Sequence, residues 1–107
     1  MYYTDCVDLR FDWDPLKSNV NRRKHGVSFD EAAEAFSDEH ALLLAEPDHS
    51  SDEERFVLLG VSSRLRLLVV CHCYRKNDEI VRIISARKAN RTEREIYDQR
   101  RSRGSLR

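Results

Sequence analysis

The chain has 107 residues, of which 40% are hydrophobic and 36% are charged, and its formal net charge is zero. This length supports one modest core, so we expect a single domain over residues 1–107. No apolar run approaches the ~18–20 residues of a membrane helix. The acidic N-terminus has no signal-peptide profile. We therefore expect a cytoplasmic protein that does not contact membranes.

The neutral total hides opposite charges in the two halves of the chain. Residues 1–54 carry 5 Lys/Arg and 14 Asp/Glu, a net of −9, whereas residues 55–107 carry 14 and 5, a net of +9. A basic half of this kind can bind phosphates. The alternative is that the two halves neutralise each other within the fold.

The first half of the chain predicts one strand and two helices. Residues 7–13 alternate between apolar and polar side chains, which indicates a half-buried strand. Residues 14–25 begin with Asp-Pro and end in a basic run, which is typical of a capped helix, and Gly26 fits the left-handed position after it. Residues 28–38 start with a Ser-x-x-Glu capping box and continue with helical apolar spacing.

The second half predicts four strands and a final helix. The expected strands are 41–46, 54–62, 66–75 and 79–86. The expected helix is 88–101, with Ala89, Ile96 and Tyr97 facing inward, and the tail 102–107 is expected to fray. Short turns between the last three strands predict an antiparallel meander. The expected fold class is α+β, a small antiparallel sheet flanked by helices in the order β-α-α-β-β-β-β-α.

Several familiar types of site are missing from the sequence. It has no Gly-rich phosphate loop, no His-x-x-x-His or Cys-x-x-Cys spacing, and no serine in a nucleophile elbow. These absences disfavour nucleotide hydrolases, zinc enzymes and esterases, and we expect no metal and no cofactor. An odd cysteine count, three, fits poorly with a disulfide scaffold.

Arginines gather where the last strand meets the last helix. Arg82, Ser85 and Arg87 lie on or just past the 79–86 strand, and Arg91 and Arg94 follow on the helix. The planar guanidinium fork suits phosphate recognition. Taken singly, each arginine could equally form a surface ion pair with an acid of the helix. Strict alternation puts Arg82 and Arg87 on opposite faces, so the strand must end or twist between them if both serve one site.

Other candidates lie elsewhere in the chain. Lys24 and His25 could transfer protons, since histidine titrates near pH ~6.5, or could merely complete a helix C-terminus. His49, in the polar loop 47–52, is a further candidate or an ordinary loop residue. The remaining candidates are Arg55 and Arg75, which lie at the ends of predicted strands, and Tyr97, which follows Arg94 by about one helical turn.

Four segments together resemble BrnT-type toxins, the ribonuclease half of bacterial type II toxin–antitoxin pairs. They are FDWDPLKSNVNRRKHGVSFDEAAEAFSD, DHSSDEERFVLLGVS, LLVVCHCYR and VRIISARKANRTEREIYD, and they cover most of residues 10–98. The resemblance implies a RelE-like fold. It also implies metal-independent RNA cleavage that inhibits translation. The implied partners are an RNA substrate and a cognate antitoxin with a ribbon-helix-helix domain, which would bring the complex to operator DNA.

The resemblance assigns roles by motif to a set of residues in this chain. They are Lys24, His25, Glu54, Arg55, Arg82, Ser85, Arg87, Arg94 and Tyr97. The implied reaction is attack of the RNA 2′-OH on the adjacent phosphorus, with three arginines, Arg55, Arg82 and Arg87, on the phosphate.

The proton roles in this reaction stay open. Glu54 or His25 would be the base, and Lys24 or Tyr97 would support the leaving oxygen. We expect Arg75, Ser85, Arg91 and Arg94 to contact RNA. The alternatives are a non-catalytic binding module and a degenerate toxin kept for antitoxin binding and operon autoregulation.

Overall fold

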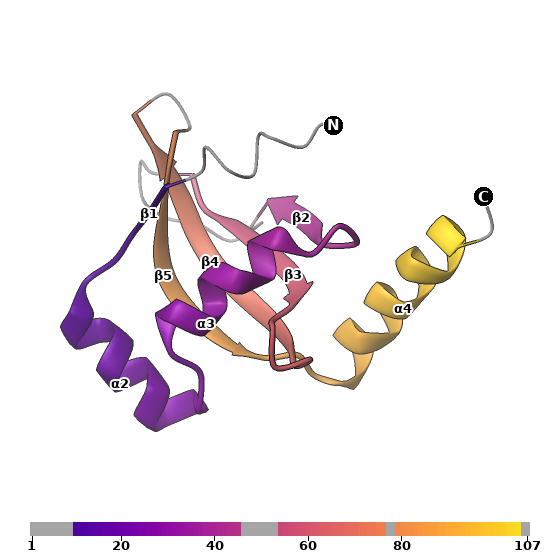
Figure 1. The fold of residues 1–107 in the computed structure, drawn as a ribbon, viewed down its shortest axis with the longest axis horizontal. Coiled ribbons are helices and arrows are strands. Elements are labelled where there is room, and N and C mark those ends of the chain that lie inside the picture. The colour runs from indigo at the N-terminus through magenta and orange to yellow at the C-terminus, as the bar shows by residue number, and fades with distance from the viewer. Residues whose placement is uncertain (1–9, 46–53, 77–78, 106–107) are drawn as a thin grey trace.

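A computed structural model describes residues 10–45, 54–76 and 79–105 (Figure 1). Within these ranges the chain forms five strands, three α-helices and one 3₁₀ helix. In chain order they are β1 (Arg10–Asp12), α2 (Pro15–His25), α3 (Phe29–Glu34), η1 (Ala35–Ser37), β2 (Leu42–Ala45), β3 (Phe56–Val61), β4 (Leu67–Arg75), β5 (Ile80–Lys88) and α4 (Arg91–Ser105).

The five strands form one sheet in the order β1-β5-β4-β3-β2. The pairs β3–β4 and β4–β5 are antiparallel, as the short turns predict, and β2–β3 is antiparallel as well. The prediction of a wholly antiparallel sheet is wrong, because β1 pairs with β5 in parallel. β5 therefore has a parallel neighbour on one side and an antiparallel neighbour on the other, so the sheet is mixed.

The two predicted helix ends around residue 26 form as expected. Gly26 has φ +73° and donates its N–H to the carbonyl of Arg22, which closes α2. Ser28 Oγ accepts a hydrogen bond from Glu31 N–H at the start of α3. The second half of the predicted capping box is absent, because the Glu31 carboxylate instead accepts hydrogen bonds from Arg66.

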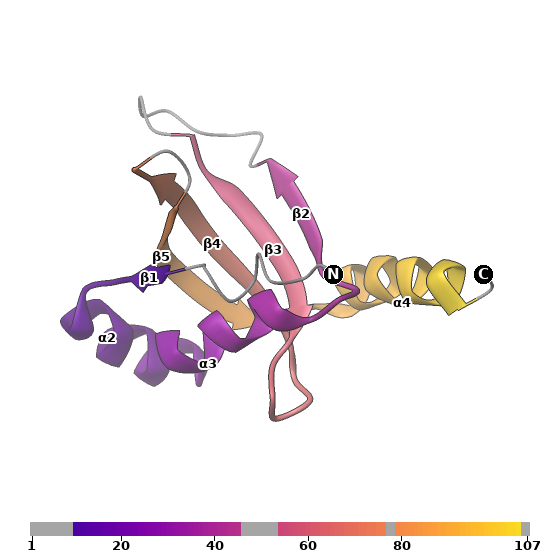
Figure 2. The same cartoon turned by 45° about the horizontal axis from the view of Figure 1, so that its top comes forward.

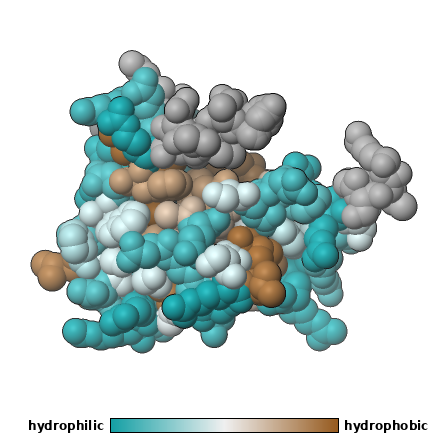
Figure 3. Space-filling model, viewed as in Figure 1, coloured by the Kyte–Doolittle hydropathy of each residue, from teal (hydrophilic) through white to brown (hydrophobic). Residues whose placement is uncertain are grey.

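The sheet separates two apolar clusters on opposite faces. On one face, α2 and α3 cover a core that includes Phe29, Leu68 and Val81. On the other face, α4 contributes Tyr97 to a smaller cluster with Val69. From the side of α2 and α3, the surface is mostly hydrophilic, with apolar areas where the strands show above α3 (Figure 3).

A glycine in β3 lets the helical layer approach the sheet closely. A Cβ on Gly60 would lie 2.7 Å from the carbonyl oxygen of Ala35, which is shorter than any real Cβ contact. The α3–η1 segment therefore rests directly against β3, and it crosses in front of the sheet in Figure 1.

The imidazole of His72 is buried completely, within a group of aromatic rings on the α3 side. Its ring centroid lies 4.8 Å from that of Phe36 and 5.1 Å from that of Tyr74. Burial lowers the pKa of His72, although the contact with the Val70 carbonyl opposes this shift. His72 is therefore a neutral core residue.

Several element boundaries differ from the prediction. The first strand was expected over 7–13; residues 7–9 lie outside the described residues, and β1 ends at Asp12. The last helix begins at Arg91 and not at residue 88, because Lys88 still pairs with Leu68 in the sheet. It ends at Ser105, so 102–105 are helical and not a frayed tail.

Asn21 joins α2 to the sheet. Its side-chain Nδ2 donates to the carbonyls of Val27 and Ala86, both at 2.8 Å, and its Oδ1 accepts from Ala86 N–H at 3.2 Å. The residue is 7% exposed, so these groups have little access to water. The contact fixes the end of α2 beside β5.

Replacing Asn21 with Ala should lower the free energy of unfolding by about 2–3 kcal/mol, because it leaves buried backbone groups without partners. Urea unfolding followed by circular dichroism would measure the change. The matched control is Asn19→Ala, since Asn19 is exposed on the same helix and should matter little. Equal effects of the two substitutions would contradict this role.

Candidate functional site

An irregularity in β5 brings the arginines of this strand to one face of the sheet. Ser85 pairs with Cys71 and Ile83 pairs with His72, so Ile84 is an extra residue without a partner on β4. Such a β-bulge shifts the alternation of side chains by one position. The core residues of β5 are therefore Val81 and Ile83 before the bulge and Ala86 after it.

Because of the bulge, Arg82 and Arg87 can lie on the same face of the sheet, which strict alternation does not allow. Arg82, Ser85 and Arg87 pair with Cys73, Cys71 and Val69, which all point away from the α2–α3 core. The strand does not end between Arg82 and Arg87; it shifts its register. We call this side of the sheet, with Arg55, Arg82, Ser85 and Arg87, the arginine face.

Arg55 and Arg82 lie toward the end of the arginine face near β1. Continued alternation from β3 places Arg55 opposite Cys73, whose other neighbour is Arg82. Arg82 Nη1 donates to Asp12 Oδ2 at 2.6 Å, across the β1–β5 pair. The Nε of Arg55 is buried, and no residue in the described part of the chain accepts a hydrogen bond from it. A buried donor of this kind favours an acceptor supplied by a ligand.

Arg87 lies at the other end of the arginine face, where α4 begins. Its Nη1 and Nη2 donate to Glu93 Oε1 and Oε2, both at 2.8 Å. Glu93 also forms a reciprocal capping box with Asn90, through bonds of 2.8 and 2.9 Å. The hydrogen bond from Arg87 lowers the pKa of Glu93, so the acid stays ionised beside the arginine.

Lys24 and His25 are exposed in the last turn of α2, at the edge of β5. Asn21, one turn earlier, bonds to Ala86, which lies between Ser85 and Arg87. Because β1 pairs only with residues 80–82 of β5, this stretch of edge has no neighbouring strand. Asn21 thus holds the last turn of α2 near Ala86, at the end of β5 that carries Arg87.

Tyr97 takes a different position from the other candidates. It is 4% exposed, and its hydroxyl donates to Asp38 Oδ2 at 2.5 Å. Burial raises the pKa of Tyr97, and the bond to Asp38 raises it further. Its neighbour Ile96, which was expected to face inward, is 44% exposed. Tyr97 fastens α4 to the loop after η1.

The remaining candidates are exposed and spread over the molecule. Glu54 precedes Arg55, Arg75 ends β4, and Arg91 and Arg94 lie in the first turns of α4. The Nε of Arg91 lies 3.9 Å from Oε2 of Glu95, one helical turn along α4. The candidate His49 lies outside the described residues.

Sequence reasoning missed the acid that contacts Arg82. It left open that a site arginine pairs with an acid of the last helix, as Arg87 does. The pairing of Asp12 with Arg82 depends on the parallel β1–β5 contact, which no local pattern signals. Glu93 carried a signal, because Asn90-x-x-Glu93 is a capping-box pattern. Among the described residues, no group of His, Cys, Asp or Glu could hold a metal ion, and no helix could span a membrane.

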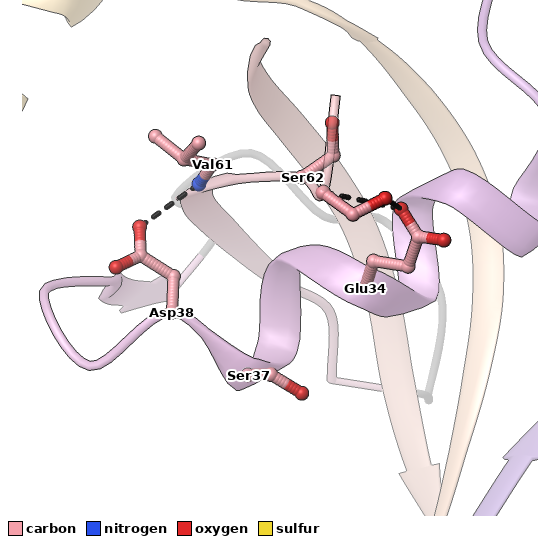
Figure 4. Close-up of a pocket in the computed structure, with 6 residues that line it drawn as sticks. Glu34, Ser37, Asp38, Val61 and Ser62 are labelled. Carbon is pink, nitrogen blue, oxygen red and sulfur yellow. Dashed lines mark hydrogen bonds between the residues drawn. The ribbon is translucent and has the colours of Figure 1, made fainter. Parts of the chain in front are cut away.

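A shallow pocket of about 400 Å³ lies between the α3–η1 segment and the end of β3 (Figure 4). Glu34 there accepts hydrogen bonds from Ser63, and Asp38 accepts from Val61 N–H (2.9 Å) and from Tyr97. Burial raises the pKa of Asp38, but these hydrogen bonds outweigh it and lower the pKa overall. The pocket is acidic, so it is unsuited to phosphates.

The fold and the arginine face define a small α+β protein that presents cations across one side of its sheet. The model of the family described as "Ribonuclease toxin, BrnT, of type II toxin-antitoxin system" matches residues 13–93. The chain therefore belongs to the BrnT family of ribonuclease toxins.

A solved structure supports the fold of this family. The crystal structure of the Brucella abortus ribonuclease toxin BrnT is similar with a TM-score of 0.54 and 22% sequence identity, over 78% of this chain and 99% of that chain. The broader RelE-like relation stays a prediction. A search of curated proteins gives no match.

Tyr97→Phe should lower the free energy of unfolding by about 1–2 kcal/mol, because the buried side of Asp38 loses a donor. RNA cleavage by the folded variant should stay near that of the wild type. Thermal unfolding and a cleavage assay on the same sample would measure both. If Tyr97→Phe lost cleavage while keeping its stability, the hydroxyl would belong to the chemistry.

Proposed function

We propose that the protein is a metal-independent endoribonuclease that binds single-stranded RNA along its arginine face. The observation that carries this proposal is the bulge at Ile84, which puts Arg82, Ser85 and Arg87 on one side of the sheet. Several guanidinium groups on one face suit a run of phosphates. Membership in a family of ribonuclease toxins supports RNA as the substrate.

The spacing along β5 and the ion pairs of its arginines support their assignment to different phosphates. Arg82 and Arg87 lie about 13–16 Å apart along the strand, at ~3.3 Å per residue with one residue in a bulge. This is the spacing of the backbone, and the two guanidinium groups are held by different acids, Arg82 by Asp12 and Arg87 by Glu93. We therefore assign them to different phosphates. Arg87 would bind the scissile phosphate, and Arg55 and Arg82 would bind a neighbouring one.

The reaction would be attack of the RNA 2′-oxygen on the adjacent phosphorus. The P–O bond to the 5′-oxygen breaks, and a 2′,3′-cyclic phosphate and a 5′-hydroxyl are formed. DNA lacks the attacking hydroxyl. Arg87 would stabilise the charge that develops on the phosphoryl oxygens.

In this scheme, two residues at the end of α2 take part in proton transfer. His25 would take the proton from the 2′-hydroxyl, and Lys24 would support the leaving oxygen. Their support is the Asn21–Ala86 contact, which holds the end of α2 at the edge of β5, next to the residue that precedes Arg87. Glu54, next to Arg55, is assigned to the other end of the arginine face and is the weaker candidate for the base.

Purified protein should cleave a single-stranded RNA in EDTA and leave DNA of the same sequence intact. Arg87→Ala should slow cleavage about 100-fold or more, by analogy with oxyanion donors, and His25→Ala by about 10²-fold or more. Arg100→Ala is the matched control, because Arg100 is exposed in the second half of α4, and this helix extends beyond the edge of the sheet (Figure 2).

Circular dichroism would show that each of these variants is folded. Intact RNA with the wild type, or loss of cleavage in EDTA alone, would refute the proposal. Cleavage by Arg87→Ala at the wild-type rate would remove Arg87 from the site. If expression without a partner caused no growth arrest, a degenerate or purely binding role would replace the enzyme.

We further propose that its antitoxin carries a ribbon-helix-helix domain and brings the complex to operator DNA. The support is the type II toxin–antitoxin family to which the chain belongs. Co-expression with the protein encoded beside this gene should relieve growth arrest. In a gel-shift assay, the complex should bind the promoter and the toxin alone should not. Promoter binding by the toxin alone would contradict this division of roles.

A further inference from the structure

Glu93 holds the guanidinium of Arg87 in one orientation. Both carboxylate oxygens accept from Arg87, through two parallel bonds of 2.8 Å. The carboxylate is itself held, because Glu93 Oε1 accepts from Asn90 N–H and Glu93 N–H donates to Asn90 Oδ1. The side chain of Glu93 is 24% exposed, so the pair is partly shielded from water. This arrangement is more rigid than an ordinary surface ion pair.

The guanidinium still has donors for a phosphate. It has five N–H groups. Glu93 takes one from Nη1 and one from Nη2, and the carbonyl of Lys88 takes the second one from Nη1. The N–H of Nε and the second N–H of Nη2 remain, on the same side of the planar group. No residue that the structure describes accepts from Arg87 Nε, so this side can bind two oxygens of one phosphate.

We propose that Glu93 is a positioning residue, which holds Arg87 so that its Nε–Nη2 side meets the scissile phosphate. This inference rests on the proposed RNA cleavage. It gives a function to the first turn of α4, a helix that contributes none of the four residues of the arginine face. Glu93 touches no RNA and acts through Arg87 alone.

Electrostatics alone would give Glu93 the opposite effect. A carboxylate beside a phosphate site repels RNA, so its removal should strengthen binding and, if Glu93 merely blocked Arg87, should speed cleavage. A positioning residue behaves differently. Its removal leaves a mobile arginine, and misplacement of a catalytic group by about 1 Å can cost ~100-fold in rate.

The test compares three variants with the wild type on one defined RNA in EDTA. They are Glu93→Ala, Glu93→Gln and Asn90→Ala. Titration with a non-cleavable RNA carrying a 2′-deoxy or 2′-methoxy group at the scissile position gives the affinity. Single-turnover cleavage at saturating protein gives the rate. Asn90→Ala is the matched control, because it removes the other half of the capping box, the bond from Glu93 N–H to Asn90 Oδ1. It leaves the backbone bond from Asn90 N–H to Glu93 Oε1 and the two bonds between Glu93 and Arg87.

Glu93→Ala should slow single-turnover cleavage by about 10–100-fold, while RNA affinity stays the same or rises. Glu93→Gln keeps one acceptor oxygen and should recover part of the rate. Asn90→Ala should cleave near the wild-type rate. In an Arg87→Ala background, Glu93→Ala should cause no further loss, because its effect passes through Arg87.

Three results would overturn the inference while leaving RNA cleavage intact. The first is faster cleavage by Glu93→Ala than by the wild type. The second is a loss of cleavage rate in Asn90→Ala as large as that in Glu93→Ala. The third is the same loss of rate when Glu93→Ala is added to Arg87→Ala. A wild-type protein that does not cleave RNA would overturn the proposed function and this inference together. Thermal unfolding of every variant separates lost positioning from lost folding.

Discussion

The bulge at Ile84 determines which side chains of β5 point into the α2–α3 core and which point to the arginine face. Without the extra residue, the positions after it would exchange faces, and Ala86 would leave the core while Arg87 entered it. An unpaired arginine in an apolar core is costly, so the bulge is required by packing as well as by the site. The α2–α3 core and the arginine face therefore depend on the same irregularity.

The opposite charges of the two halves are partly neutralised within the fold. Asp12 pairs with Arg82 and Glu31 pairs with Arg66, and each pair joins the acidic half to the basic half. The Arg87–Glu93 pair lies within the basic half. The ion pairs leave donors unused, as at Arg87, so neutralisation and phosphate binding can coexist on the same residues.

Local patterns were sufficient for most of the elements. Apolar runs separated by short turns predicted β3, β4 and β5, and the residues around Gly26 and Ser28 predicted the junction of α2 and α3. The parallel pairing of β1 was missed, because it depends on contact between segments about seventy residues apart and has no local signature.

For the candidate site, the sequence could name residues but could not place them relative to one another, and their roles stay a prediction. The arginines were recognisable from their fork chemistry and from the family resemblance, whereas their common face follows from a bulge that alternation cannot reveal. The inward face of α4 was only half predicted: Tyr97 is buried and Ile96 is exposed. Ile96 and Tyr97 are adjacent, and α4 has few apolar residues. The helical spacing of apolar residues therefore cannot determine which of the two points toward the sheet.

The amide of Asn21 has a further consequence for solubility. It accepts from the N–H of Ala86 and donates to its carbonyl, as the peptide group of a neighbouring strand would. The part of β5 that β1 leaves uncovered would otherwise present an open backbone to other chains, which is a common start of edge-to-edge aggregation. One side chain on α2 thus takes the place of a missing strand and keeps this edge from recruiting another molecule.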